Sequence, residues 1–236
     1  MPFSFSMAFQ PMVDVRDRSI LAYEALVRGP GGEPAAHVLE RVTDANLYRF
    51  DQSCRVKALE LAARLGLPAR ARHGLSINFL PGAVYEPAAC LKVTLETARR
   101  LGLPVSQIIF EVTEQERVVD SARPTFILKE YRRQGLRTAI DDFGSGYSGL
   151  NLLTQFQPEI LKLDLNLTRG IEADPVRRAI VSGLIQMSEA LGILLVAEGI
   201  ETVAEMQAVA ALGIFRMQGF LFARPAFERL PEPTFP

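Results

Sequence analysis

The sequence has no tryptophan, only two cysteines and two histidines, and no excess of either charge, with 26 Lys and Arg residues against 27 Asp and Glu residues. Cys54 and Cys90 have no C-x-x-C partner and no His at metal-ligand spacing, so we expect buried free thiols in a reducing compartment. A net charge of −1 argues against binding to a nucleic-acid polymer or a membrane surface, which requires a positive excess. No apolar run approaches the ~20 residues that cross a bilayer, and no signal-peptide pattern is present. These absences predict a cytoplasmic protein.

The chain does contain 236 residues, of which 48% are apolar. Short apolar or β-branched runs alternate with segments of helical period, a pattern typical of parallel strands joined by crossover helices. Eight strands are predicted, at residues 6–13, 20–27, 75–80, 108–113, 137–140, 160–165, 194–198 and 218–223. Helices are predicted at residues 36–65, 87–101, 121–134, 149–156, 175–191 and 203–212.

The connection between the first two predicted strands, residues 14–19, is too short for a parallel crossover. These strands should therefore be antiparallel. The expected fold class is α/β, a modified TIM (β/α)8 barrel with an antiparallel first strand. We expect one domain over residues 1–236, with the proline-rich residues 226–236 as a C-terminal tail.

Polar residues interrupt or end nearly every predicted strand. They are Glu24, Asn78, Glu111, Asp141, Asp142, Lys162, Asp164, Glu198 and Gln218. A single acid at a strand end is usually solvated, and Asp141-Asp142 before Phe-Gly-Ser-Gly also fits a turn. Lys162 is harder to explain as a structural residue because lysine is rarely buried without a partner, which Asp164 on the same strand face would supply. Since strand ends build the active site of a barrel, the recurrence favours one common site.

Charge decides what such a site would bind. Five converging acids against Lys162 and Arg28 leave a balance of −3, which two divalent cations would bring to +1, suitable for a phosphodiester anion. Ligands that are all oxygen, without Cys or His, select Mg²⁺ or Mn²⁺ over Zn²⁺. Two such ions favour in-line displacement at phosphorus. The predicted reaction class is metal-assisted phosphodiester hydrolysis.

The motifs around these residues resemble those of the EAL-domain cyclic di-GMP phosphodiesterase family, from Phe9-Gln10-Pro11 to Arg224-Pro225. The matching segments are Glu24-Ala25-Leu26 with Arg28, Asn78 in Ser-Ile-Asn-Phe-Leu-Pro, Glu111 and Glu114 in Phe-Glu-Val-Thr-Glu, Asp-Asp-Phe-Gly-Ser-Gly-Tyr-Ser-Gly-Leu at 141–150, Lys162-Leu163-Asp164, Ala-Glu-Gly-Ile-Glu-Thr at 197–202 and Gln218-Gly219-Phe220. Their order and spacing together are specific, whereas the first tripeptide alone is not.

The resemblance implies that the substrate is cyclic di-GMP and the product linear pGpG. It implies two Mg²⁺ or Mn²⁺ ions per site, with Ca²⁺ inhibitory, one held by Glu24, Asn78, Glu111 and Asp141 and the second by Asp141, Asp142 and Glu198. A water between the metals would be the nucleophile, and Lys162 would join Glu24 and Glu198 in catalysis. Lys162 would orient or deprotonate this water, or stabilise charge at the phosphate.

The resemblance also implies roles around this centre. Leu26, Arg28 and Gln218 would contact substrate, and Asp164 and Glu201 would orient Lys162 or the strand ends. Glu114 with Gly144, Ser145 and Gly146 resembles a control loop beside a homodimer contact, although Glu114 also fits a helix start. Gly29 and Phe215 depart from the family pattern, which has Trp and an acid there, and the shortened loop after Gly29 resembles the variant that accompanies flavin-based light sensors. A sensor or GGDEF domain is therefore an expected companion.

Two alternatives stay open. One is a cyclic di-GMP receptor without turnover that acts through a protein partner, although such receptors usually lack a metal ligand and none is missing here. The other is an aldolase with Lys162 as the Schiff-base amine, which the surrounding carboxylates oppose because they would keep the lysine protonated.

Overall fold

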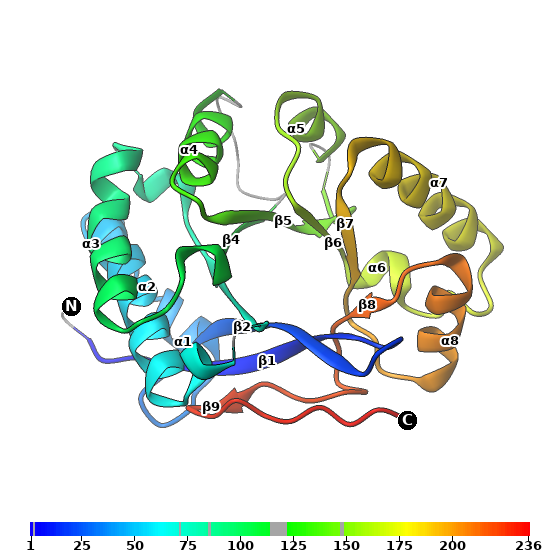
Figure 1. The fold of residues 1–236 in the computed structure, drawn as a ribbon, viewed down its shortest axis with the longest axis horizontal. Coiled ribbons are helices and arrows are strands. Elements are labelled where there is room, and N and C mark those ends of the chain that lie inside the picture. Colours follow the sequence, from blue (N-terminus) through cyan, green and yellow to red (C-terminus); the bar gives the residue numbers. More distant parts are fainter. Residues whose placement is uncertain (2, 71, 85, 114–121, 147–148) are drawn as a thin grey trace.

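The computed structural model describes the chain except residues 2, 71, 85, 114–121 and 147–148. Its strands form a closed barrel in the order β2-β3-β4-β5-β6-β7-β8-β1, closed by a β1–β2 pairing (Figure 1). Strands β2 to β8 pair in parallel, and β1 is antiparallel to both of its barrel neighbours. The barrel strands are β1 Ser6–Asp14, β2 Ser19–Arg28, β3 Gly74–Asn78, β4 Ile108–Thr113, β5 Arg137–Phe143, β6 Ile160–Leu163, β7 Leu194–Ala197 and β8 Arg216–Met217. The expected modified TIM barrel with an antiparallel first strand is confirmed.

Helices surround the barrel except along β1, where the C-terminal segment lies (Figure 1). They are α1 Ala35–Leu39, α2 Leu47–Arg64, α3 Pro87–Arg100, α4 Ala122–Arg133, α5 Gly149–Gln155, α6 Leu165–Thr168, α7 Pro175–Leu191 and α8 Val203–Leu212, with short 3₁₀ turns at Leu67–Ala69, Pro81–Ala83 and Val105–Gln107. In the described part of the chain, none of the helices combines the length and the apolar character required to cross a membrane.

The single helix predicted over residues 36–65 is wrong, because α1 and α2 are separate. The side chain of Asn46 accepts the N–H of Thr43 and donates to the carbonyl oxygen of Arg41. Such side-chain bonds offer the backbone an alternative to the helical ladder. Asn46 is also the residue that directly precedes α2.

The strand predicted at residues 218–223 is also wrong, because β8 ends at Met217 and the chain then turns. Gln218 and Leu221 exchange backbone hydrogen bonds with Ile200 in the loop after β7. Gly219 makes this approach possible, since a Cβ there would lie 1.9 Å from the Ile200 carbonyl oxygen. The loops after β7 and β8 are thereby joined at the barrel mouth.

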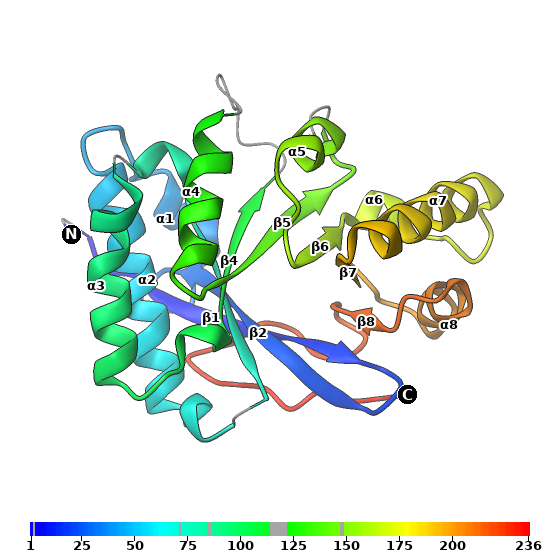
Figure 2. The same ribbon diagram turned by 45° about the horizontal axis from the view of Figure 1, so that its top comes forward.

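Residues 226–236, expected to be a tail, are bound along the barrel (Figure 2). Strand β9 (Ala226–Phe227) pairs with β1 antiparallel, and the hydroxyl of Tyr23 donates to the Pro231 carbonyl oxygen. Thr234 donates its backbone N–H to Phe222. The segment therefore covers the side of the barrel that has no crossover helix.

The barrel interior is closed below its mouth by a layer of apolar side chains, one from each of six strands. They are Met12, Ala22, Ile109, Ala139, Ile160 and Val196, all buried. A second, larger apolar cluster packs the helices against the outside of the strands. Cys54 and Cys90 lie in this outer cluster as free cysteines, which confirms the expectation of buried thiols.

Candidate metal centre and active site

A layer of polar side chains lies directly above the apolar layer inside the barrel. Because side chains of a strand alternate, the residue two positions further on projects into the same interior. Ala22 is thus followed by Glu24, Ile109 by Glu111, Ala139 by Asp141, Ile160 by Lys162 and Val196 by Glu198. The carboxyl ends of parallel strands meet at one rim, so five groups distant in sequence converge there.

Lys162 occupies the centre of this layer, and its side chain is fully buried. Its Nζ lies 2.8 Å from Asp141 Oδ1, 2.9 Å from Glu198 Oε1, 3.1 Å from Glu111 Oε2 and 3.4 Å from Glu24 Oε2. One ammonium group therefore serves four carboxylates. The sequence predicts Asp164 as a partner of Lys162, and this prediction is wrong. Asp164 instead accepts the N–H of Asn166 and caps α6.

Two of these acids also accept hydrogen bonds from neutral side chains. Glu24 accepts a hydrogen bond from Asn78 Nδ2 at 3.0 Å and another from Gln218 Nε2 at 2.7 Å. Ser76 donates its hydroxyl to Glu111. Oδ1 of Asp141, in contrast, is buried and has no hydrogen-bond partner among the described residues, because its approach to Lys162 lacks hydrogen-bond angles.

The shifted pKa values of these groups indicate an excess of negative charge in the cluster. Burial raises the pKa of Glu111 to about 8, although Lys162 partly opposes the shift. Burial and the neighbouring Asp141 raise the pKa of Glu198 well above its ordinary value and that of Asp142 to about 6. Burial acts to lower the pKa of Lys162, but the surrounding carboxylates outweigh it and raise that pKa well above the usual value. One lysine therefore does not neutralise the cluster.

Two groups of carboxylates have the spacing of metal ligands. Oxygens of Glu24, Glu111 and Asp141 lie within 4.8 Å of one another, and so do oxygens of Asp141, Asp142 and Glu198. Asp141 belongs to both groups. Because Asn78 uses its amide nitrogen for Glu24, its carbonyl oxygen is the atom available to an ion in the first group. An oxygen-only donor set, a carboxylate that belongs to both groups and uncompensated charge together fit hard divalent cations.

Asp142 reaches this site through a local backbone irregularity. Neighbouring residues of a strand normally face opposite sides, yet Asp141 and Asp142 line the same cavity. The pairing of β5 with β6 shifts between Ile140 and Phe143, and Asp142 has φ +53°. A bulge of this kind redirects a side chain, and Asp tolerates the left-handed region better than most residues. Ser145 donates both its N–H and its hydroxyl to the Asp142 carbonyl oxygen, which supports the turn.

A cavity of about 360 Å³ opens over the polar layer. It is lined by eight residues expected at the site, Glu24, Leu26, Asp141, Asp142, Asp164, Glu198, Glu201 and Gln218, and also by Gln10, Leu165, Arg169, Gly199, Gly219 and Phe220. The predicted residues are therefore mostly brought together.

Arg28 and the glycine-rich residues 144–146 are not among the described residues that line that cavity. Arg28 donates to the carbonyl oxygen of Val27 and lines an adjoining cavity of about 250 Å³, which also contains Leu26 and Asn78. Gly144, Ser145 and Gly146 lie beside Asp142 along the chain, and Gly144 has φ +97°. Glu114 lies outside the described residues.

The sequence analysis missed three residues whose side chains make polar contacts at the site. Ser76 precedes Asn78 by two positions on β3, so the strand alternation that identified the acids would have found it. Gln10 accepts a hydrogen bond from Gln218 Nε2 at 3.2 Å and donates to Ala223. Arg169 lines the cavity and pairs with Glu201 at 2.9 Å, but no local signal distinguishes it from a surface arginine.

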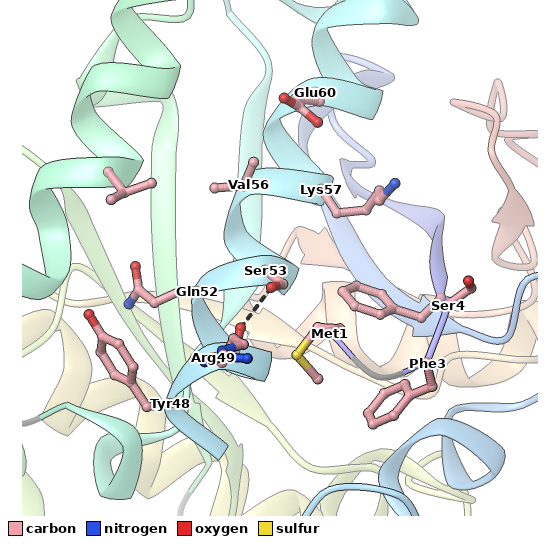
Figure 3. A pocket seen from close by; sticks show the side chains of 12 residues that line it. Met1, Phe3, Ser4, Tyr48, Arg49, Gln52, Ser53, Val56, Lys57 and Glu60 are labelled. Carbon is pink, nitrogen blue, oxygen red and sulfur yellow. Dashed lines mark hydrogen bonds between the residues drawn. The ribbon is translucent and has the colours of Figure 1, made fainter. Parts of the chain in front are cut away.

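A larger cavity, of about 700 Å³, lies on the outside of the molecule between the N-terminal segment and α2 (Figure 3). Arg49, Gln52 and Ser53 of α2 face it, and the hydroxyl of Ser53 donates to the Arg49 carbonyl oxygen. Among the described residues that line it, Glu60 is the sole carboxylate. Its lining offers no group comparable to the acids of the barrel mouth.

Comparison with known proteins agrees with this geometry. Residues 4–225 match the model of the EAL domain family, described as "EAL domain". The blue light- and temperature-regulated antirepressor BluF of Escherichia coli is 31% identical over 97% of this chain and 56% of its own length. The cyclic di-GMP phosphodiesterase RocR of Pseudomonas aeruginosa is 30% identical over 98% of this chain and 59% of its own. The chain thus spans about half the length of these curated relatives.

Solved structures of other proteins share this fold. A standalone EAL protein from Vibrio cholerae in its c-di-GMP-bound form superposes with a TM-score of 0.95 at 50% identity, covering 99% of this chain and 97% of that one. Klebsiella pneumoniae BlrP1 in a manganese and cyclic di-GMP complex superposes with a TM-score of 0.91 at 36% identity, covering 98% of this chain and 59% of that one.

Proposed function

The chain belongs to the EAL domain family, and on this premise we propose that it is a metal-dependent phosphodiesterase that hydrolyses cyclic di-GMP to linear pGpG. The observation that carries the proposal is the buried cluster of four carboxylates around Lys162 beneath an open cavity. A cluster with this much uncompensated charge is costly to fold unless cations join it. RocR, named a cyclic di-GMP phosphodiesterase, supports the substrate.

Glu24, Asn78, Glu111 and Asp141 would hold one Mg²⁺ or Mn²⁺ ion, and Asp141, Asp142 and Glu198 the other. When bound, the two ions lower the pKa of a water and neutralise charge on the phosphate. BlrP1, solved with manganese and cyclic di-GMP, supports Mn²⁺ as one suitable ion.

In the metal-free protein Lys162 holds a proton at Nζ, because the surrounding carboxylates outweigh burial and raise its pKa well above the usual value. A protonated amine donates hydrogen bonds and cannot accept a proton. Of the roles left open by the sequence, we therefore favour orienting the water and stabilising charge at the phosphate over deprotonation. The same protonation argues against the aldolase alternative, which needs a neutral amine.

Leu26, Arg28 and Gln218 are the proposed substrate contacts. Leu26 lines both the acidic cavity and the adjoining one, so a ligand that extends past it would reach Arg28. Gln218 donates to Glu24 and Gln10, while its Oε1 is buried without a partner among the described residues. That oxygen is an acceptor available to substrate or to site water.

Direct assay tests the proposal. Purified protein is incubated with cyclic di-GMP and Mn²⁺ or Mg²⁺, with and without chelator, and pGpG is measured by chromatography. We expect pGpG only with metal, and at least a hundredfold less from Glu24→Ala. Ca²⁺ added against Mn²⁺ is expected to lower the rate. Equal product from Glu24→Ala and the unaltered protein would contradict a metal mechanism at this site.

BluF, whose name describes an antirepressor, favours a second candidate, a cyclic di-GMP receptor that acts through a protein partner. Binding of cyclic di-GMP without pGpG formation in Mn²⁺ would support the receptor and exclude the enzyme. The expected homodimer, the companion sensor or GGDEF domain, the control loop of Glu114 and the cytoplasmic location remain predictions.

A further inference from the structure

The inner face of α2 carries an ion pair that is buried in the outer core. Arg55 Nη2 lies 2.6 Å from Asp51 Oδ2, and the two side chains are 0% and 2% exposed. The guanidinium is enclosed by aromatic rings, 4.8 Å from the centroid of Phe110 and 5.7 Å from that of Phe79, and it donates to the hydroxyl of Tyr131. None of these groups lines the acidic cavity.

Packing alone does not explain this pair. Removing two charges from water costs several kcal/mol per ion, and apolar side chains of similar volume often serve as well or better. Leu and Met at these positions would pack against the same rings. The pair therefore requires a second reason, which the remaining oxygen of Asp51 supplies.

Asp51 Oδ1 accepts the backbone N–H of Leu80 at 3.1 Å. The preceding N–H, that of Phe79, donates to the Glu111 carbonyl oxygen at 3.0 Å. Both peptide groups that follow Asn78 are thus held, one by the neighbouring strand and one by α2. Asn78 is the last residue of β3, where the ladder would otherwise release the chain.

We propose that Asp51, with Arg55 as its counterion, is a positioning residue that holds the end of β3 so that Asn78 presents its amide to the metal centre. Burial raises the pKa of Asp51 and Arg55 opposes that rise, so Arg55 favours the ionised carboxylate, and Asp51 tethers Leu80. This inference rests on the proposed function, because it assumes that Asn78 ligates a divalent cation. Groups hydrogen-bonded to a metal ligand typically change metal affinity by about 10- to 100-fold, and Asp51, which acts through the backbone of Leu80, is expected at the low end of that range.

Two double variants separate the tether from the packing. Asp51→Asn with Arg55→Met removes both charges but keeps an oxygen for the Leu80 N–H. Gln52 Nε2 now donates to Asp51 Oδ2 at 3.4 Å, and a half-turn of the Gln52 amide would offer the new amide nitrogen Oε1, which is buried and has no partner among the described residues. Asp51→Leu with Arg55→Met has nearly the same shape and no acceptor. Single variants are avoided because an unpaired Arg55 would be buried.

Mn²⁺ affinity of the metal-free variants is measured by calorimetry, and exchange of the Leu80 amide by hydrogen–deuterium exchange. We expect the Leu-containing pair to bind Mn²⁺ about tenfold more weakly and to lose Leu80 protection. The Asn-containing pair should stay within about threefold of the unaltered protein. Equal Mn²⁺ affinity in the two folded variants would overturn the inference.

The background of Asn78→Ala supplies the control. If Asp51 acts through Asn78, the difference between the two double variants should vanish in that background. A difference of the same size would show a structural effect and overturn the inference. Absence of Mn²⁺ binding by the unaltered protein would instead reject the proposed function, so the two failures are distinguishable.

A measurement on the unaltered protein covers the case in which a variant does not fold. Linkage requires that if the Leu80 tether favours Mn²⁺ binding, Mn²⁺ favours the tether by the same factor. Saturating Mn²⁺ should therefore slow exchange of the Leu80 amide. Unchanged exchange in a protein that binds Mn²⁺ would overturn the inference.

Discussion

Lys162 Nζ lies 2.8 Å from Asp141 Oδ1, and this contact joins the only ammonium group in the described polar layer to the carboxylate shared by both proposed metal groups. The two residues come from adjacent strands, β5 and β6. A cation that binds Asp141 would compete with the lysine for this oxygen. Lys162 therefore offsets part of the negative charge that the proposed metal ions would neutralise.

Loss of Lys162 should destabilise the metal-free protein. Lys162→Met removes the ammonium partner of four buried acidic side chains, and breaking a buried pair costs about 3 kcal/mol or more. We expect the free energy of unfolding in EDTA at pH 8 to fall by about that amount, and saturating Mn²⁺ to recover part of it. Urea unfolding measures both. Lys92→Met, at an exposed position of α3, is the control and should change stability by less than about 0.5 kcal/mol. Equal effects of the two substitutions would contradict the stabilisation of the buried acids by the charge of Lys162.

Mn²⁺ affinity should increase with pH. Glu111, with a pKa of about 8, and Glu198, with a pKa well above its ordinary value, hold protons in the metal-free protein. Metal ligation requires the ionised form, so binding releases protons and strengthens as pH rises from 6 towards 8. Calorimetry in two buffers of different ionisation enthalpy measures the proton release. Affinity that does not vary between pH 6 and 8 would contradict this prediction, and Glu111→Gln should reduce the slope.

Gln10 should act through Gln218. Gln10 accepts from the Gln218 amide, which fixes the side of that amide that faces the cavity. A lost hydrogen bond of about 1 kcal/mol corresponds to a roughly fivefold loss of kcat/KM for Gln10→Leu. Because the two residues share one network, Gln10→Leu combined with Gln218→Leu should cost little more than Gln218→Leu alone. Steady-state kinetics with cyclic di-GMP tests this, and multiplicative losses would show that the residues act independently.

A side chain at position 199 should destabilise the folded protein. Its φ is +68°, and a Cβ there would lie 2.6 Å from the Leu165 Cβ, just after Glu198. Gly199→Ala should therefore lower the free energy of unfolding by about 2 to 3 kcal/mol, since overpacking adds to the backbone strain. Gly192→Ala has the same φ of +68° but an open surrounding, and should cost only about 1 kcal/mol. Equal losses in urea unfolding would show that the contact with Leu165 is unimportant.

Several features could be predicted from the sequence because they depend on local periodicity. Strand alternation places Glu111, Asp141 and Lys162 two positions after interior apolar residues, so their convergence required only the barrel and its polarity. The antiparallel first strand followed from the short connection after Asp14. The positions of the acids, and the preference of such acids for hard cations, could therefore be predicted from the sequence.

Other features depended on contacts between segments distant in sequence. The convergence of carboxylates on Lys162 was predictable, but the choice among them was not, since Asp164 satisfies the same strand rule but caps α6 instead. The bulge that turns Asp142 inward, and the pairing of β9 with β1, arise from neighbours that the local sequence does not contain.

The sequence by itself determined which groups face the barrel interior, because a strand's repeat of two residues and the polarity of each side chain are local properties. Only the tertiary structure decided how Asp51 and Arg55, on a helix outside the barrel, reach the backbone after Asn78. Helical period indicates which face of α2 is buried but not which N–H that face meets. That choice is made by the packing of α2 against β3, which brings the carboxylate of Asp51 to the buried N–H of Leu80, a donor that needs a partner.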